Sequence, residues 1–469
     1  MTKPVRVCLI LEGSYPFITG GVSAWVQDLI SSLPELEFSL LTISPKAGQE
    51  LRYAPPPNVM EHRDVVLGSA AGAAGRRAGR KSVRGLIAMH AGLFSGKGAD
   101  ILGLLRAFAR EGSRPDNRLL SRPELWNLLA NMNRARNPAY AFSDYFWAWQ
   151  SAHRMMFDAL AADAPEADVY HAVSTGFAGL AALNAKARTG APFFLSEHGL
   201  YHKEREIEIR KAGFVRGYQR DMWINLYNSL SRLCYAQADA ITALFEENRQ
   251  KQIELGADPG RCTVVPNGID LRRFSSVRRE RREGFHVGLV GRIVPIKDVK
   301  TYIAAARIVV EAAPDARFYA IGPTDEDPDY YEECRALVAS FGLGARFVFT
   351  GRQDVLSYYS FLDLMALTSV REAQPLVILE GWAAGVQTVG TKVGNVPELL
   401  NYDERFLAPS KDPEALARCI LFARANPELM KRLSAENAER VRKLYGKEDM
   451  IRRFGEIYSS LARGSPWRA

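Results

Sequence analysis

Residues 285–321 read FHVGLVGRIVPIKDVKTYIAAARIVVEAAPDARFYAI. The first six form an apolar run that ends at Gly291, and a second apolar run covers residues 317–321. Between them an amphipathic stretch extends from about Asp298 to Ala312, with the spacing of a helix. Two short apolar runs joined by an amphipathic helix are typical of a parallel βαβ unit. This stretch therefore predicts an α/β fold built on a parallel sheet.

The same alternation occurs in both halves of the chain. Its strands are expected to be near-continuous apolar runs, because parallel strands are buried on both faces. In the first half these runs are residues 5–11, 38–43, 168–173, 193–197, 240–244 and 262–266. In the second half they are residues 285–290, 317–321, 346–350, 362–368 and 386–390. Since 469 residues exceed one ordinary core, we predict two doubly wound, Rossmann-like domains.

The joint between these domains is expected to begin at Pro266-Asn267-Gly268. An N-terminal domain would then span residues 1–268, and a C-terminal domain residues 269–446. The arginine-rich run 272–282 is expected to be a charged linker or a solvated face. Near the end of the chain, residues 447–463 predict an amphipathic helix. Its apolar face consists of Ile451, Phe454, Ile457, Tyr458 and Leu461.

Residues 69–136 interrupt the alternation of expected strands and helices. They are rich in glycine and alanine, then in arginine, and are expected to form an insertion with some helix and a mobile loop. The close-set cations in this basic insertion are Arg76, Arg77, Arg80, Lys81 and Arg84.

Composition and net charge exclude only a few classes of function. The formal net charge of +8 is moderate for this length, and the arginine runs lack the interleaved aromatic residues of nucleic-acid binders. Residues 5–11 are expected to be a buried strand rather than a signal peptide, and we find no apolar stretch of membrane-spanning length. The five cysteines are scattered, which favours a reduced, cytoplasmic protein.

The first candidate motif is EGSYPFITGGVSAW at residues 12–25. A strand ends here, a flexible turn follows, and a helix begins near Val22. Gly20 and Gly21 let backbone N–H groups approach a ligand closely, and a helix N-terminus favours a phosphate. A plain strand-to-helix turn is the alternative. The motif is not GxGxxG, so it gives little support to dinucleotide binding.

The second motif is GRIVPIKD at residues 291–298. Arg292 and Lys297 both follow the first strand of the second half. Ligands of open α/β sheets bind at the carboxyl ends of the strands, and an arginine with a lysine can neutralise a pyrophosphate. The alternative is a pair of surface cations on a loop.

The third motif is EAQPLVILE at residues 372–380. Pro375 suits the first turn of a helix, so the backbone amides of Leu376 and Val377 are expected to be unpaired donors. Glu372 lies before this helix and Glu380 within it. Their spacing is not that of a glycosidase pair, and they would contact different parts of one elongated ligand.

The fourth motif is SEHGLYHKER at residues 196–205, in which His198 closes a strand. A hydrogen-bonded loop histidine is the alternative to a functional one. No histidine has zinc-like spacing with a cysteine. The acidic run 325–327 follows Gly322-Pro323, and a solvated turn is favoured there over a metal-binding DxD motif.

Taken together, these four segments resemble family 4 retaining glycosyltransferases of the GT-B fold. The order of GRxxxxKD and E-x7-E, and the run PNGID at residues 266–270, resemble the family pattern. Residues 12–25 and 196–206 resemble the branch that makes the Pel exopolysaccharide of bacterial biofilms. The resemblance implies two facing domains with the donor in the cleft. It also implies that the helix 447–469 completes the first, acceptor-side domain.

The resemblance also implies roles for the matching residues. The candidate catalytic residues are His198, Glu372, Arg292 and Lys297, and the candidate nucleotide- and substrate-binding residues are Gly20, Gly21, Arg292, Lys297, Leu376, Val377 and Glu380. Arg292 and Lys297 would hold the pyrophosphate, and Glu380 the ribose. Glu372 and His198 would contact the transferred sugar, and the two glycines the phosphate or the acceptor.

These roles imply a transferase for a UDP-sugar, either UDP-glucose or a UDP-N-acetylhexosamine, that extends an extracellular polysaccharide of Pel type. No metal or other cofactor is expected, because cations and a helix N-terminus can stabilise the leaving diphosphate. The expected partner is an inner-membrane synthase complex, contacted peripherally. A UDP-sugar 2-epimerase on the same scaffold and a non-catalytic nucleotide-sugar-sensing subunit are the alternatives.

Overall fold

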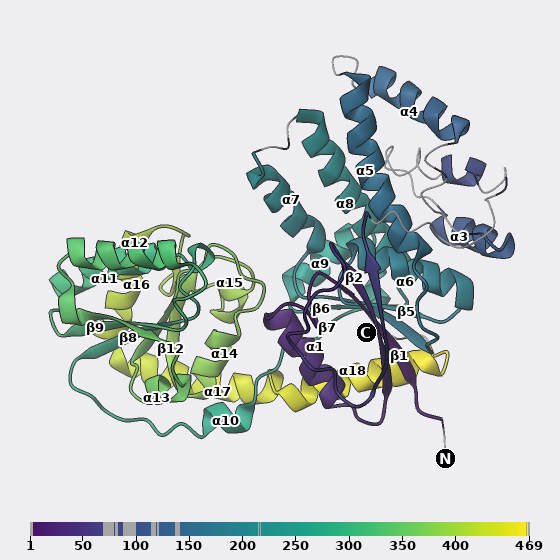
Figure 1. The fold of residues 1–469 in the computed structure, drawn as a ribbon. Helices are drawn as coiled ribbons and strands as arrows, with labels where there is room; N and C mark the ends of the chain where they lie inside the picture. The colour runs from purple at the N-terminus through teal and green to yellow at the C-terminus, as the bar shows by residue number, and fades with distance from the viewer. Residues whose placement is uncertain are drawn as a thin grey trace. The chain divides into compact units, whose positions relative to one another are not determined.

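The computed structural model describes residues 3–68, 100–113, 122–136, 141–213 and 217–465, together with residues 79, 83–87, 119, 215 and 467. The chain divides into two compact units (Figure 1). Unit 1 consists of residues 1–265 and 451–469, and unit 2 of residues 266–450. Four of the five cations of the basic insertion lie outside the described residues; Arg84 is described and is exposed.

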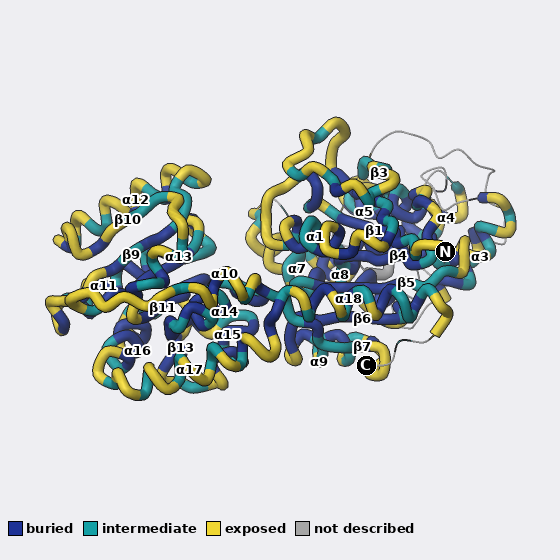
Figure 2. The backbone as a smooth tube through the Cα atoms, turned by 90° about the horizontal axis from the view of Figure 1, so that it is seen from below, coloured by how far each residue is buried: buried dark blue, intermediate teal, exposed yellow. Residues whose placement is uncertain are grey.

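Unit 1 is built on a parallel sheet of seven strands within the described ranges, in the order β3-β2-β1-β4-β5-β6-β7. Their bounds are β1 Arg6–Glu12, β2 Glu37–Ser44, β3 Val59–Val66, β4 Val169–Ala172, β5 Phe193–Glu197, β6 Ala240–Ala243 and β7 Cys262–Val264. The central strands are buried along their whole length, as Figure 2 shows in dark blue. This burial explains why they are continuous apolar runs.

The helices of unit 1 cover both faces of this sheet. They are α1 Gly21–Ser31, α3 Ile101–Arg110, α4 Pro123–Arg136, α5 Phe142–Ala161, α6 Gly176–Thr189, α7 Tyr201–Lys211, α8 Gly217–Gln237, α9 Glu246–Glu254 and most of α18 Lys447–Ala462. α6 is rich in alanine and almost entirely buried, so α5 and α8 can pack closely around it.

The last helix belongs mainly to unit 1, although α18 begins in unit 2. Figure 1 shows it in yellow along the unit 1 sheet. All five residues of its expected apolar face are buried. The hydroxyl of Tyr458 lies 2.7 Å from Nδ1 of His171 on β4, and Nε2 of His171 lies 2.7 Å from the Ser196 hydroxyl on β5. These contacts anchor the end of the chain to two central strands.

Unit 2 is also built on a parallel sheet, with six strands in the order β10-β9-β8-β11-β12-β13 over its described residues. They are β8 Phe285–Val290, β9 Ala316–Ile321, β10 Phe347–Gly351, β11 Leu364–Leu367, β12 Gln387–Thr391 and β13 Leu407–Ala408. The helices are α10 Leu271–Ser275, α11 Val299–Ala312, α12 Pro328–Ser340, α13 Val355–Tyr359, α14 Leu376–Ala383, α15 Val396–Leu399, α16 Pro413–Ala425 and α17 Pro427–Leu444.

The doubly wound α/β architecture predicted from the sequence is confirmed. Each apolar run matches a strand to within a few residues, but two strands were missed. β3 is a half-exposed edge strand with polar residues, VMEHRDVV, and β13 has only two residues. Neither has the long apolar run that identifies a buried strand.

The arginines in the run at residues 272–282 are exposed, as expected of a solvated face, but two of them also make contacts within unit 2. The Arg279 guanidinium donates to the backbone carbonyl oxygens of Tyr359 and Leu362, and the Arg282 guanidinium lies 3.7 Å from the centre of the Phe361 ring. Burial lowers the pKa of Arg279. This segment is therefore docked on unit 2 by its cations.

Both sheets reverse their strand order beside the first strand, between β1 and β4 in unit 1 and between β8 and β11 in unit 2. Such a switch point is where open α/β sheets bind ligands. Among the helices in the described part of the chain, none is both long and apolar enough to cross a bilayer.

Candidate functional site

The loop after β8 in unit 2 is held in place by backbone contacts with its neighbours. The Gly291 amide donates to the Ile321 carbonyl at 2.9 Å, and the Val370 amide donates to the Ile296 carbonyl at 2.9 Å. Gly322, with φ of +151°, packs so closely that a Cβ there would lie 2.1 Å from the Gly291 carbonyl oxygen. The loop that carries Arg292 and Lys297 is therefore fixed to the ends of β9 and β11.

Lys297 and Glu372 meet at the switch point of unit 2. Nζ of Lys297 lies 2.5 Å from Oε1 of Glu372, and the Ser369 hydroxyl donates to the same oxygen at 2.7 Å. The Thr368 hydroxyl donates to the Lys297 carbonyl at 2.7 Å. The two candidates come from loops 75 residues apart. Their side chains remain 20% and 15% exposed, so a ligand can reach the pair.

Arg292 lies on the same loop but has a different partner. Its guanidinium is 2.6 Å from Oε2 of Glu326, and both side chains are about half exposed. Asp327 accepts a hydrogen bond from the Tyr330 amide at 3.1 Å and so caps α12. The acidic run 325–327 thus supplies a counter-ion and a helix cap. No cluster of three or more potential metal ligands occurs in the described part of the chain.

The helix α14 begins directly after Glu372. Pro375 is its N-cap, so the amides of Leu376 and Val377 are in the first turn and lack acceptors within the helix. Further along, Glu380 is partly buried and accepts a long hydrogen bond, 3.4 Å, from the Tyr359 hydroxyl. Burial raises the pKa of the Glu380 carboxyl, and the bond from Tyr359 opposes that shift.

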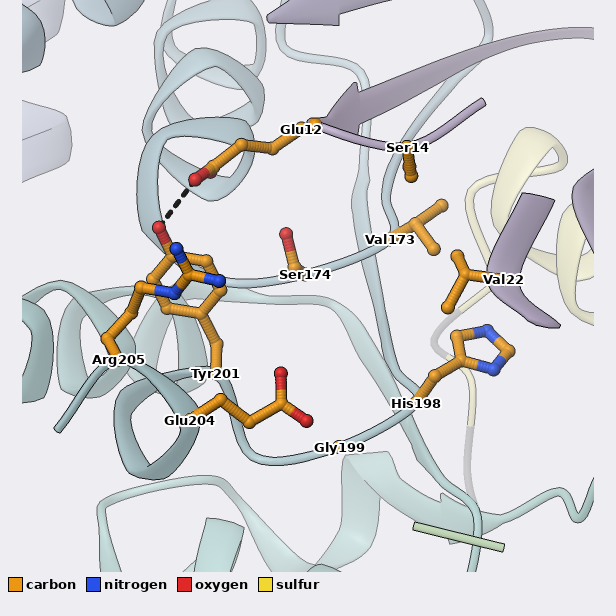
Figure 3. Close-up of a pocket in the computed structure, with 11 residues that line it drawn as sticks. Glu12, Ser14, Val22, Val173, Ser174, His198, Gly199, Tyr201, Glu204 and Arg205 are labelled. Carbon is orange, nitrogen blue, oxygen red and sulfur yellow. Dashed lines mark hydrogen bonds between the residues drawn. The ribbon is translucent and has the colours of Figure 1, made fainter. Parts of the chain in front are cut away.

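The switch point of unit 1 forms a pocket of about 300 Å³ (Figure 3). Its walls come from the carboxyl ends of β1, β4 and β5, and from the first turns of α1 and α7. The lining residues are Glu12, Gly13, Ser14, Val22, Val173, Ser174, His198, Gly199, Tyr201, Glu204 and Arg205.

Glu12 is a partly buried carboxylate that accepts hydrogen bonds from neutral donors. Oε1 accepts from the Tyr201 hydroxyl at 2.5 Å, and Oε2 accepts from the backbone amides of Phe177 and Ala178 at 3.0 and 3.3 Å. Those amides are at the N-terminus of α6, where a negative charge is stabilised. Burial raises the pKa of Glu12, while these hydrogen bonds and the nearby Arg205 oppose that shift.

Tyr201 is fixed from its other side by a second carboxylate, that of Glu197, which is buried. Oε1 of Glu197 accepts from the Tyr201 backbone amide at 3.2 Å, and Oε2 accepts from Tyr235 at 2.6 Å and from Gln252 at 3.0 Å. Burial raises the pKa of Glu197 as well. Gly176 adds to this packing, because it has φ of +70° and a Cβ there would lie 2.4 Å from the Tyr201 ring.

Arg205 and Glu204 project from the first turns of α7. The Arg205 guanidinium carbon is 5.3 Å from the centre of the Tyr201 ring, and Nε is buried without a hydrogen-bond partner. The Glu204 carboxylate lies so close to Gly199 that a Cβ on that glycine would be 2.3 Å from Oε1. Gly199, two residues beyond the end of β5, thus leaves room for the Glu204 side chain.

His198, the residue directly after the end of β5, lines the same pocket. Its ring packs edge-on against Trp25, with ring centres 4.3 Å apart, and Nε2 is buried without a hydrogen-bond partner. Burial lowers its pKa to about 4, so the ring is neutral at pH 7. Gly20 and Gly21 begin α1 and face open space, outside the pocket lining.

Sequence reasoning missed most of this pocket. It named His198, but not Glu12, Tyr201, Glu204 or Arg205 as a group. Glu12 could have been noticed, because a carboxylate that directly ends a buried apolar strand is placed at the ligand-binding edge of a parallel sheet. The link to Tyr201 needs a contact across 189 residues, which the sequence pattern does not reveal.

The fold is that of known two-domain glycosyltransferase structures. A sucrose-phosphate synthase from Thermosynechococcus elongatus is 17% identical with a TM-score of 0.60, covering 98% of this chain and 100% of that one. HepE from Anabaena, in complex with UDP and glucose, is 15% identical with a TM-score of 0.58, with the same two coverages. At these identities the likeness establishes the GT-B fold.

The curated relatives are similar to only part of this chain. N-acetyl-alpha-D-glucosaminyl L-malate synthase from Bacillus anthracis is 26% identical over 50% of this chain and 63% of its own length. A D-inositol 3-phosphate glycosyltransferase from Thermomonospora curvata is 27% identical over 59% of this chain and 67% of its own length. The chain thus spans about half to two thirds of the length of the curated relatives it matches.

Two family models match the chain, one in each unit. Residues 284–426, which include both motifs of unit 2, match the model described as glycosyl transferases group 1. Residues 5–260, which include the whole unit 1 pocket, match the model described as a domain of unknown function (DUF3492). Since this second match covers more than half of the chain, the protein belongs to the DUF3492 family and carries a glycosyl transferases group 1 domain in its second unit.

Proposed function

We propose that the protein is a glycosyltransferase that uses a UDP-sugar, with unit 2 as the nucleotide-sugar-binding domain and unit 1 as the acceptor-side domain. The observation that carries this proposal is the meeting of Lys297 and Glu372 at the unit 2 switch point, next to the open N-terminus of α14. The group 1 match over the same residues supports it, as does the HepE complex with UDP and glucose.

The proposed chemistry uses each of these groups. Arg292 and Lys297 stabilise the negative charge that develops on the leaving UDP, together with the amides of Leu376 and Val377. Glu380 accepts hydrogen bonds from the ribose hydroxyls. The bond from the anomeric carbon to the phosphate oxygen breaks, and a bond to the acceptor oxygen forms on the same face. The acceptor proton passes to the leaving phosphate, so the configuration is retained.

Two groups are proposed to act on the sugar rather than on the nucleotide. Glu372 binds hydroxyls of the transferred sugar once Lys297 turns to the diphosphate. His198, neutral and with an unpartnered Nε2, contacts the sugar near the reacting carbon. The donor sugar in this proposal is glucose or an N-acetylhexosamine.

Calorimetry with UDP tests the nucleotide site. Arg292→Ala and Lys297→Ala should each weaken UDP binding by about 1.5–3 kcal/mol, the range of charge-assisted hydrogen bonds. Lys297→Ala also leaves the Glu372 carboxylate facing the diphosphate, so the double variant Lys297→Ala/Glu372→Gln should bind UDP better than Lys297→Ala alone. Arg335→Ala, an exposed cation on α12 paired with Glu332, is the matched control. Unchanged affinity in both single variants would rule out the site.

Product analysis tests the reaction class. Glu372→Gln and His198→Ala should lose sugar transfer to a short oligosaccharide acceptor far more than they lose UDP affinity. An epimerase would instead release an epimerised nucleotide sugar without any acceptor, and a sensing subunit would bind UDP-sugar without turnover. Normal transfer by both variants would remove these residues from the mechanism.

The proposed product is an extracellular polysaccharide of Pel type, made with an inner-membrane synthase complex that the protein contacts peripherally. The basic insertion is the proposed contact, since a polybasic segment gains about 1 kcal/mol per cation near anionic lipid. Its five cations are Arg76, Arg77, Arg80, Lys81 and Arg84. Replacing them with Ser or Gln should release the protein from the membrane fraction while UDP binding persists. Unchanged fractionation would contradict this contact.

A further inference from the structure

The chain passes between the two units twice, once at residues 265–266 and once at residues 450–451. On the unit 2 side, the two crossings are joined by backbone hydrogen bonds. The Ile269 amide donates to the Tyr445 carbonyl at 2.9 Å, and the Lys447 amide donates to the Ile269 carbonyl at 3.0 Å. This pair of segments, residues 266–269 and 445–447, is the interunit connection.

The interunit connection is tied to the turn that begins α14. The Asn267 amide donates to Oε1 of Gln374 at 2.8 Å, across 107 residues of sequence. Gln374 lies directly before Pro375, the N-cap of α14, and only 7% of its surface is exposed. Because a buried donor that loses its acceptor is costly, this bond holds Asn267 at the turn.

The turn itself is fixed from another side by the loop after β12. The Asn395 amide donates to the Ala373 carbonyl at 3.0 Å. Gly394 has φ of +51°, and a Cβ there would lie 2.1 Å from the Glu372 carbonyl oxygen. The backbone of the turn therefore has little room to shift, and Gln374 keeps a defined place within it.

Groups assigned to the donor lie on both sides of Gln374 in the chain. Two residues before it, Glu372 belongs to the ion pair at the unit 2 switch point. Two and three residues after it are the open amides of Leu376 and Val377. A bound nucleotide sugar would contact the chain before and after Gln374 and restrict its motion. The bond to Asn267 would pass that restriction on to the interunit connection.

Packing alone does not account for a glutamine at this position. Nε2 of Gln374 and Oδ1 of Asn267 are buried without hydrogen-bond partners. Leaving such atoms unpaired costs free energy, and an apolar side chain of similar shape would avoid the cost at Nε2. What the glutamine adds is the acceptor for the Asn267 amide. Its side chain thus serves to hold a backbone segment rather than to fill a core.

We propose that Gln374 is a positioning residue that couples the donor site of unit 2 to the interunit connection. Occupation of the donor site steadies the turn at residues 372–375. Gln374 transmits this to Asn267 and, through Ile269, to the second crossing. This assignment rests on the proposed transferase function and adds a residue that acts through the connection rather than on the substrate.

Hydrogen exchange at single amides tests the coupling in the full chain. In the wild type, saturating UDP should slow exchange at the Asn267 amide. Gln374→Met keeps the length of the side chain but has no oxygen, so exchange at Asn267 should become at least about fivefold faster and should no longer respond to UDP. Gln387→Met is the matched control, because it removes a similarly buried side-chain amide, 4% exposed, from β12. It should leave exchange at Asn267 as in the wild type.

Kinetics separate positioning from a general loss of stability. Gln374→Met should bind UDP with unchanged affinity and keep its KM for the donor. Its kcat for sugar transfer should fall at least about fivefold, because transfer needs correctly placed groups of both units. Gln387→Met should transfer at the wild-type rate. Equal losses of kcat in the two variants, or exchange at Asn267 that Gln374→Met leaves unchanged, would overturn the proposal.

Calorimetry with UDP on the same preparations keeps this test apart from that of the transferase function. If the wild type binds UDP and exchange at Asn267 does not respond, the coupling is wrong while the donor site stands. If the wild type binds no UDP, the transferase proposal and the coupling both fail.

Discussion

Over the described residues, the unit 1 sheet has one strand more than the unit 2 sheet, but the order of the other six is the same in both. The residues at the two switch points are nevertheless arranged differently. In unit 1 the carboxylates of Glu12, which is partly buried, and Glu197, which is buried, are bonded to neutral donors such as Tyr201, Tyr235 and Gln252. In unit 2 the carboxylate of Glu372 is bonded to a cation, Lys297, and both remain partly exposed. The hydrogen bonds in unit 1 hold the side chains of the pocket in place, whereas the charged groups in unit 2 can bind a ligand in place of each other.

The physical reason lies in what each arrangement costs to break. A partly exposed ion pair contributes on the order of 1 kcal/mol or less, so a diphosphate can replace Glu372 at Lys297 at little cost. A buried carboxylate with several donors cannot be replaced, because each buried donor left unpaired costs about 1–3 kcal/mol. Unit 1 therefore keeps its shape, whereas the unit 2 ions can exchange partners.

The largest expected effect is the loss of the Glu197 carboxylate. Glu197→Ala leaves Tyr235, Gln252 and the Tyr201 amide without their shared acceptor. The free energy of unfolding should fall by at least about 3 kcal/mol, with loss of hydrogen-exchange protection confined to unit 1. Glu254→Ala, which removes an exposed partner of Lys251, should change stability by less than about 0.5 kcal/mol. Equal effects of the two substitutions would contradict the inference that the hydrogen bonds of Glu197 hold the unit 1 pocket in place.

The second largest expected effect is a dependence of the stability of unit 1 on pH. His153 is buried on α5, stacks on Trp149, and has a pKa that burial lowers to about 4. Since its unfolded pKa is about 6.5, only the unfolded chain takes up a proton as the pH falls from 6.5 towards 4. Stability is thus lost with acid, on the order of 2 kcal/mol between pH 7 and pH 5.

The measurement compares denaturant unfolding of wild type and His153→Gln at both pH values. Glu12 and Glu197 have raised pKa values, so their contribution to stability falls as the pH rises, which is opposite to that of His153. The difference between the two proteins cancels this carboxylate contribution, because both contain it. A wild-type acid slope no steeper than that of the variant would refute the assignment to His153.

The same contrast explains what the sequence could predict. Lys297 and Glu372 lie in short loops directly after apolar strands, so the parallel topology alone places them at one edge of the sheet. The Glu12–Tyr201 and Glu197–Gln252 contacts join residues 189 and 55 positions apart. They depend on how α7 and α9 dock on the sheet, and neither periodicity nor spacing specifies that. The sequence therefore predicts which residues lie at the edge of a sheet, but not the hydrogen-bond partners of buried polar groups.

A smaller effect is expected at Glu380, which combines features of both sites. It is partly buried like Glu12, yet its carboxylate has only one long hydrogen bond among those described, from Tyr359. Glu380→Gln should weaken UDP binding by about 1 kcal/mol, the cost of one lost hydrogen bond. With UDP analogues that lack the 2′ or the 3′ hydroxyl, the penalty should shrink for the hydroxyl that Glu380 binds. If Glu380→Gln loses as much affinity for each analogue as it loses for UDP, Glu380 does not contact the ribose.

The smallest expected effect is that of chelation, which should leave UDP binding unchanged. The diphosphate charge is to be matched by Lys297 and Arg292, and the nearby carboxylates are already engaged, Glu326 with Arg292 and Asp327 with the first turn of α12. Calorimetry with UDP should therefore give the same affinity in excess EDTA as in magnesium or manganese. Glu326→Gln sharpens the test: it frees Arg292 without creating a metal ligand, so UDP affinity should rise slightly in EDTA. If affinity collapses on chelation and manganese restores it, the exchangeable charges of unit 2 are not sufficient to hold the diphosphate.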